Sequence, residues 1–194
     1  MDLPEITSKD SQEVLTIRAS AFAMFLLSLV MFFVAVNAVL VVRLGLSGWN
    51  IDLQPDSFKR WLFLGSLVML VVVHEALHAL AALLWGKAQF SSIRFGFKLK
   101  WLVAYCHCAS PMRMGVFRIY SLLPLALTTV VTGLVLWWAP TVWTLLLFSS
   151  TFSACAGDIL IYLKIQEFPG NLWVQEHPSG IGCYVWPEGQ SPPE

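Results

Sequence analysis

The chain has 194 residues, of which 57% are hydrophobic and only 12% are charged, and its mean hydropathy is +0.70. This composition excludes an ordinary soluble domain and predicts a membrane protein. The formal net charge is zero, so the placement of the charges is more informative than their sum, and no basic surface for nucleic acid is predicted.

Four long apolar segments predict four transmembrane helices. The first is an uncharged run, longer than the about 20 residues that cross a bilayer and longer than a signal-peptide core of roughly 7 to 15, so we expect it to be retained. The second is interrupted only by two histidines and a glutamate, and the fourth contains one aspartate. The predicted helices are residues 19–42, 61–86, 119–138 and 141–163.

The segment between the second and third helices has a different pattern. In residues 93–101, apolar residues alternate with basic residues and glycine, which is the period of a strand. The predicted fold class is therefore an all-α integral membrane protein with four transmembrane helices and a small interfacial β-strand or hairpin between helices two and three. Six basic residues and no acid lie from Lys87 to Arg118, and two interpretations stay open: contact with anionic lipid headgroups and simple control of topology.

The distribution of basic residues predicts the orientation. Nine of the 12 Lys and Arg residues lie in the N-terminal arm, in the segment after the second helix and in the tail, whereas three lie in the first loop. The positive-inside rule then predicts a multi-pass protein of the cell inner (cytoplasmic) membrane with both termini in the cytoplasm. In this topology His78 lies about 12 Å and Asp158 about 8 Å from the cytoplasmic ends of their helices.

The tail after residue 163 is rich in Pro and Gly, a composition that suits irregular structure. Its aromatic stretches at residues 173–178 and 183–186 nevertheless lead us to expect that part of the tail docks. The cysteines are too few and too unevenly spread for a disulfide scaffold, and we expect free thiols on a reducing side of the membrane. They are Cys106, Cys108, Cys155 and Cys183.

The second helix carries a His-Glu-x-x-His motif that begins at His74 and ends at His78. Histidines four residues apart lie on one helix face, roughly 6 Å apart, where both can bind one Zn²⁺. Glu75 can hold a zinc-bound water and take its proton during attack on a carbonyl. Ionisable groups in a bilayer cost about 2.5 to 3.5 kcal/mol each and usually face a cavity, a partner or a metal. The structural alternative is helix packing by histidines paired to Glu75.

A catalytic zinc needs a third protein ligand and an open position for water. Asp158 is the predicted ligand, because it is the other carboxylate within a span and its depth matches that of the histidines. The alternative for Asp158 is a buried acid bonded to a threonine of the third helix. Cys155 lies one turn away on the same face and is a weaker candidate.

The sequence Cys106-His107-Cys108 also contains metal-binding residue types. Alternate residues of a strand point to opposite faces, so one metal could not easily bind all three, and a reduced cysteine pair at the interface is the preferred interpretation. The alternative is that one of these residues reaches the zinc or the substrate. We expect His177 to be a surface histidine.

Together, several segments resemble a bacterial family of putative zincin peptidases, over roughly residues 60–186. The segments are His74 to His78, Phe95-Gly96-Phe97 to Cys106-His107-Cys108, Leu123-Pro124, Ala156-Gly157-Asp158 and Glu176-His177-Pro178-Ser179-Gly180.

By wider analogy the chain is similar to the site-2 intramembrane metalloproteases, in which a later helix supplies an aspartate to a His-Glu-x-x-His site. The order Gly157-Asp158 departs from the Asp-Gly that follows Asn-Pro in those enzymes. The resemblance implies zinc on His74, His78 and Asp158 with Glu75 as general base. It also suggests that an extended substrate pairs with the strand in residues 93–101.

We therefore expect a zinc-dependent intramembrane metalloprotease, a metalloendopeptidase that hydrolyses peptide bonds of a membrane-associated protein or peptide. Residues 1–18 are the predicted cytoplasmic arm, residues 19–163 the membrane-embedded metallopeptidase domain and residues 164–194 a cytoplasmic, partly docked tail. The lipid bilayer is the other expected partner. The alternative is a non-catalytic membrane zinc-binding protein, a sensor or scaffold, which needs no base beside the metal and usually closes its coordination shell with a fourth protein ligand.

Overall fold

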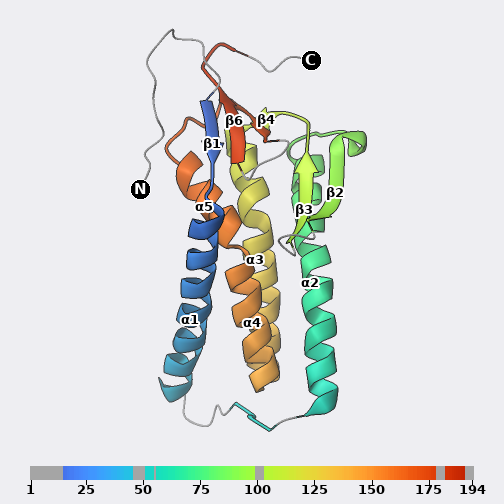
Figure 1. Cartoon of the computed structure of the whole chain (residues 1–194), viewed down its shortest axis with the longest axis vertical. Helices are drawn as coiled ribbons and strands as arrows, with labels where there is room; N and C mark the ends of the chain where they lie inside the picture. Colours follow the sequence, from blue (N-terminus) through green and yellow to red (C-terminus); the bar gives the residue numbers. More distant parts are fainter. Residues whose placement is uncertain (1–14, 46–50, 55, 99–102, 178–181, 191–194) are drawn as a thin grey trace.

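The computed structural model describes residues 15–45, 51–54, 56–98, 103–177 and 182–190 (Figure 1). In this part of the chain four helical segments are long and apolar enough to cross a membrane. These segments coincide with the four predicted ones, which are thereby confirmed as apolar helices. They are Ala21–Val42, Ser57–Leu84, Met114–Trp138 and Val142–Ile165.

The helix starts are set by local features of the sequence. Asp56 caps α2 (Ser57–Leu84) by accepting hydrogen bonds from the backbone N–H groups of Phe58 and Lys59. Helices α2 and α3 (Met114–Trp138) begin earlier than predicted, because basic residues at the edge of an apolar run do not end a helix. The first helix is α1 (Ala21–Gly45).

The predicted fourth helix is interrupted. It consists of α4 (Val142–Ala154) and α5 (Ala156–Ile165), which meet at Cys155. The backbone of Cys155 has φ −79° and ψ 7°, and its N–H lies 3.4 Å from the carbonyl oxygen of Phe152, a tightened last turn. The interruption places Asp158 in the first turn of α5.

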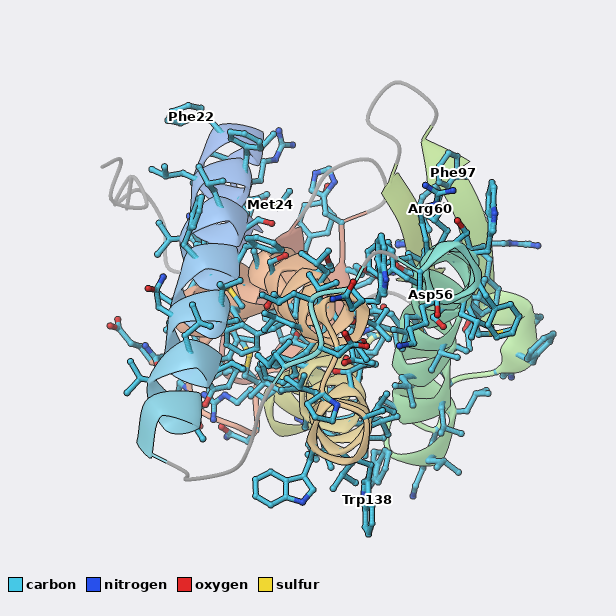
Figure 2. All side chains as sticks on the ribbon, turned by 90° about the horizontal axis from the view of Figure 1, so that it is seen from below. Phe22, Met24, Asp56, Arg60, Phe97 and Trp138 are labelled. Carbon is cyan, nitrogen blue, oxygen red and sulfur yellow. The ribbon has the colours of Figure 1, made fainter. Side chains whose placement is uncertain are left out.

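Helices α3 and α4 lie in the middle of the bundle. Helix α3 packs against α2, α4 and α5, whereas α1 packs against α4 and α5. Seen from below, α1 and α2 lie on opposite sides of the α3 and α4 pair (Figure 2). Large apolar side chains such as those of Phe22 and Trp138 point outward and are mostly exposed, as lipid-facing residues are.

Strands β2 (Ile93–Lys98) and β3 (Val103–Cys108) form an antiparallel hairpin between α2 and α3. The predicted strand or hairpin is confirmed here, although residues 99–102 lie outside the described residues. Gly96 faces Tyr105 across the hairpin, and a Cβ on Gly96 would lie 2.3 Å from the tyrosine ring. This glycine therefore lets the aromatic ring cover the strand.

A second sheet, of four strands among the described residues, was not predicted, so the all-α description is incomplete. Its strand order is β1-β6-β5-β4, and all of its pairs are antiparallel. The strands are β1 (Leu15–Arg18), β4 (Met112–Arg113), β5 (Trp173–Glu176) and β6 (Gly182–Trp186). Strands β1 and β4 are too short for a local pattern, and their partners lie far away in the sequence. Strands β5 and β6, which belong to the tail, pair in this sheet with each other and with β4 and β1.

Both sheets lie at the same end of the bundle (Figure 1). The N-terminal strand, the segment between α2 and α3 and the tail thus share one side of the helices, as the charge distribution indicated. Between the sheets and the helix ends lies a core that includes Cys106, Cys108 and Cys183. All four cysteines are free and buried, which confirms the expectation of free thiols.

Strand β1 pairs with β6 beside Cys183, whose side chain is fully buried, and this burial can be measured. Burial raises the pKa of the Cys183 thiol to about 12, so that at pH 8 only about one thiol in ten thousand is ionised. A Cβ on Gly182 would lie 1.8 Å from the carbonyl oxygen of Ile17. We therefore expect Gly182→Val to displace β1 and to raise the rate of Cys183 alkylation at pH 8 at least tenfold, measured by peptide mass spectrometry.

Gly65 provides the matched control, because nothing lies within 4 Å of a Cβ at that position. Gly65→Val should leave the alkylation rate unchanged. Rapid alkylation of Cys183 in the wild-type chain would contradict the packing of β1 over the tail.

Candidate metal centre

Three predicted residues from two helices come together. His74 and His78 of α2 have ring centroids 5.0 Å apart. The Asp158 carboxylate of α5 faces both rings: its Oδ2 lies 3.1 Å from Nε2 of His74, and its Oδ1 lies 3.4 Å from Nε2 of His78. Each of the three residues offers one ligand atom, and these three atoms all lie within 4.8 Å of one another. Among the described residues, the group has no other member.

The three residues lie inside the apolar spans. His78 is six residues before the end of α2, and Asp158 is seven before the end of α5, or about 9 and 10 Å along the helix axes. These two depths are closer to each other than the predicted depths of about 12 and 8 Å. The alternative partners were Thr128, Thr129 and Thr132 of α3. Two of them bond to helix carbonyls, Thr128 to Pro124 and Thr132 to Thr128, both at 2.7 Å, and the buried Oγ1 of Thr129 makes no hydrogen bond in the described structure.

The chemistry of the group fits a zinc ion. Ligand atoms of a tetrahedral zinc, at bonds of about 2.0 to 2.2 Å, lie about 3.3 to 3.5 Å apart, close to the two nitrogen-to-oxygen distances found here. The buried Oδ2 of Asp158 faces Nε2 of His74 and has no hydrogen-bond donor in the described structure. When both are ionised, Glu75 and Asp158 carry two negative charges, which a divalent cation would balance.

A proline in α3 explains how His78 is held. Pro124 has no backbone N–H, so the carbonyl of Tyr120, four residues earlier, lacks its helical donor. The Nδ1 of His78 takes this place and donates to the Tyr120 carbonyl at 2.8 Å. A proton on Nδ1 leaves the Nε2 lone pair free toward Asp158, which is the arrangement that orients metal-binding histidines.

Cys155 holds the other histidine. Its Sγ lies 3.8 Å from Nδ1 of His74 and donates to the carbonyl of Thr151 at 3.5 Å. The thiol thus contacts the ring nitrogen that does not face Asp158, and Cys155 is not part of the group of three. Cys155 therefore lies where it can orient the ring of His74.

Glu75 lies beside the group and against β3. Its carboxylate is near enough to His74, His78 and Asp158 for their charges to interact, and it lies close to the backbone of Cys106 in β3. Strand β3 therefore lies between Glu75 and β2, which is the strand suggested for substrate pairing. The side chains of Cys106 and Cys108 are buried and share a face of β3, as the alternation predicted.

The positions of His177 and His107 can be compared with the predictions made for them. His177 is only 5% exposed and lies 2.9 Å from Nη2 of Arg18, so the expectation of a surface histidine was wrong. The reason is that β1, an unpredicted strand, covers it. His107 does not reach the group of three in α2 and α5 but pairs with Glu176, at 3.3 Å from Nδ1 to Oε2.

Sequence reasoning missed the residues that support the ligands, above all Tyr120. The signal that could have found its role is Pro124, a proline in the middle of an apolar helix, because it exposes one predictable carbonyl. Glu176 lies in one of the segments that resemble the family, but its contacts depend on the docking of the tail and leave no local pattern.

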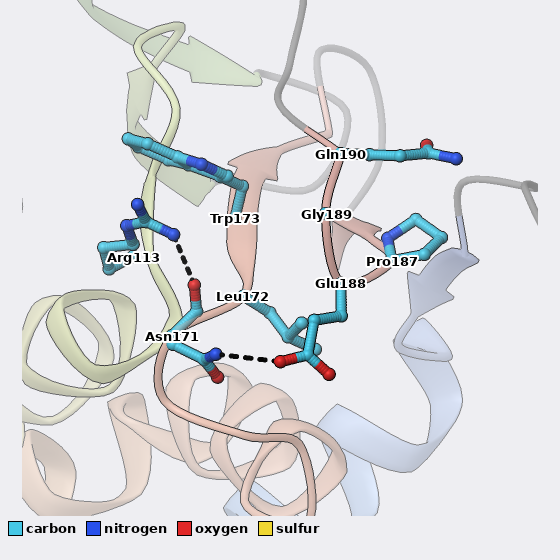
Figure 3. A pocket seen from close by; sticks show the side chains of 8 residues that line it. All are labelled: Arg113, Asn171, Leu172, Trp173, Pro187, Glu188, Gly189 and Gln190. Carbon is cyan, nitrogen blue, oxygen red and sulfur yellow. Dashed lines mark hydrogen bonds between the residues drawn. The ribbon is translucent and has the colours of Figure 1, made fainter.

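A separate pocket of about 240 Å³ lies at the sheet end, lined among others by Arg113, Trp173 and Glu188 (Figure 3). The guanidinium of Arg113 lies 4.0 Å from the centroid of the Trp173 ring. The pocket is smaller than the about 300 to 1,000 Å³ of typical ligand sites, and its lining includes no residue of the metal group. We assign the chemistry to the metal group instead.

A substitution that restores the backbone N–H at position 124 tests whether the Tyr120 carbonyl orients His78. Pro124→Ala supplies an N–H that competes for the Tyr120 carbonyl, and we expect zinc affinity to fall about tenfold. The same change should raise thermal stability, because an interior proline costs a helix about 3 kcal/mol. Chelator competition and thermal unfolding measure the two effects, and Gly133→Ala, which also favours the helix, should leave zinc affinity unchanged. Equal affinity in Pro124→Ala and wild type would contradict the role of this carbonyl.

Comparison with known proteins agrees with this geometry. The family model described as putative zincin peptidase matches residues 67–173, more than half of the chain, and the match contains His74, His78 and Asp158. No curated protein and no solved structure matches the chain. The match to the family model, over residues that include the whole candidate metal centre, means that the chain belongs to the putative zincin peptidase family.

Proposed function

We propose that the chain is a zinc-dependent intramembrane metalloprotease that hydrolyses peptide bonds of a membrane-associated protein. The observation that carries the proposal is the convergence of two imidazole Nε2 atoms and one carboxylate within 4.8 Å, inside apolar helices and beside a further carboxylate. Membership of a zincin family supports the same conclusion.

His74, His78 and Asp158 would hold the metal, and Glu75 acts as the base. A zinc ion bound there would lower the pKa of the attacking water and polarise the scissile carbonyl. Glu75 takes a proton from the attacking water and delivers it to the amide nitrogen that leaves. The hydroxyl remains on the carbonyl carbon, so hydrolysis consumes one water and breaks one C–N bond.

The number of ligands favours an enzyme over a non-catalytic zinc protein. Structural zinc sites usually have four protein ligands, whereas three protein ligands leave a position for water. In the described residues the group has three. A sensor or scaffold would also gain nothing from Glu75, whose burial in the membrane span is costly.

The depth of the site indicates where the substrate would be cut. The ligands lie about 9 to 10 Å from the ends of their helices that face the two sheets. The proposed orientation makes this the cytoplasmic side of the inner membrane, with both termini in the cytoplasm. Basic residues such as Arg94 and Arg113 there can contact anionic headgroups.

The hairpin also bears on how a substrate is held. A chain added to the outer edge of β2 would lie two strand spacings, about 10 Å, from β3 and so further from Glu75. The backbone of β3 is the nearer one, since Cys106 lies close to Glu75. We therefore propose that an unwound substrate segment is bound beside β3 and not along the far edge of β2.

Replacing the base tests the function without knowledge of the substrate. Membranes of cells that express either the wild-type chain or Glu75→Gln are compared by quantitative N-terminal proteomics. We expect new N-termini of membrane proteins with the wild type, reduced at least 100-fold with Glu75→Gln, because a general base contributes about 10² to 10⁴ in rate. The zinc content of purified Glu75→Gln should equal that of the wild type.

Glu167→Gln makes the same chemical change at an exposed position outside the site and should leave the N-termini as in the wild type. Identical N-termini with wild type and Glu75→Gln, when both contain one zinc per chain, would refute the protease.

A further inference from the structure

A second polar cluster lies between the tail and the metal centre. Its hub is Glu176 of β5, whose Oε2 accepts hydrogen bonds from the backbone N–H of Cys108 at 2.8 Å and from the hydroxyl of Tyr120 at 3.2 Å. The same oxygen lies 3.3 Å from Nδ1 of His107. One carboxylate thus joins the tail to β3 and to α3.

Tyr120 links this cluster to a metal ligand. Its carbonyl accepts from His78, and its ring centroid lies 4.7 Å from that of the His78 ring. Its hydroxyl also lies 3.2 Å from the carbonyl oxygen of Cys106, the residue whose backbone lies close to Glu75. The side chain of Tyr120 is 4% exposed, so its hydroxyl has few other partners within reach.

We propose that Glu176 is a positioning residue of the metal centre, acting through Tyr120 on His78 and through β3 on Glu75. The inference rests on the proposed metal site. Without the carboxylate, the Cys108 N–H loses its acceptor, and the Tyr120 hydroxyl keeps only the Cys106 carbonyl. A buried donor left unpaired is costly. Tyr120 and β3 then shift to find partners, and the groups that they hold shift with them.

This role makes the tail part of the site, although the family model ends at residue 173. Because energetic coupling between sites is reciprocal, zinc bound at α2 and α5 should in turn stabilise the docking of β5. The backbone N–H of Cys108 reports on this docking, since its acceptor is the Glu176 side chain. Hydrogen exchange of the segment that contains Cys108 should therefore slow when zinc is added.

Zinc affinity of the full chain in detergent tests the proposal, with a chelator as competitor. We expect Glu176→Ala to weaken zinc binding 10- to 100-fold, as the loss of groups that orient metal ligands does. Glu176→Gln keeps an oxygen acceptor for Tyr120 and Cys108 and should recover most of the affinity. In Glu176→Ala, zinc should no longer slow exchange in the Cys108 segment.

Gln175 gives the matched control on the same strand. Its Nε2 donates to the carbonyl of Ala109 at 2.6 Å, so it also ties β5 to the segment after β3, but no described contact links it to Tyr120. Gln175→Ala should keep zinc affinity within about threefold of the wild type. An equal loss in Gln175→Ala and Glu176→Ala would overturn the proposal, because general undocking of the tail would explain both.

Further outcomes distinguish a failure of the positioning role from a failure of the proposed metal site. Wild-type affinity in Glu176→Ala overturns the positioning role and leaves the metal site intact. If Glu176→Ala does not fold, Tyr120→Phe decides, since it removes only the hydroxyl: we expect several-fold weaker zinc binding, and unchanged binding overturns the proposal. A wild-type chain that binds no zinc overturns the proposed function and this inference together.

Discussion

The contact between Asp158 and the two histidines of α2 joins α5 to α2 inside the apolar spans. Three ionisable side chains lie within apolar spans, where each one alone would be costly. They are tolerable because they face one another, with 3.1 and 3.4 Å between carboxylate oxygens and Nε2 atoms. A cation that shares all three groups would turn this mutual contact into coordination.

Departures from regular helix geometry build the site. The interruption at Cys155 begins a new helix, whose first turn favours the negative charge of Asp158 through the helix dipole. Pro124 leaves a carbonyl in α3 without its helical donor, and that carbonyl orients His78. Each irregularity costs helix stability locally and supplies one element of the site.

The helices and the metal group could be predicted because their signals are local or physically restrictive. The spacing of His74 and His78 follows from the helix period, and Asp158 was identified because acids are rare in apolar spans and its depth matched. The four-stranded sheet could not be predicted. Strand β4 has two residues, and β1 pairs with residues more than 160 positions away, so neither leaves a local pattern. The burial of His177 depends on that sheet and was missed with it.

X-ray absorption at the zinc edge of the purified chain identifies the ligands of the metal. We expect one zinc per chain with two imidazole nitrogens and oxygen donors at about 2.0 to 2.2 Å, and no sulfur among the ligands. A sulfur ligand at about 2.3 Å would contradict the assignment, since it would bring Cys155 or a cysteine of β3 into the coordination shell. Four protein ligands with no exchangeable water would instead indicate a structural site.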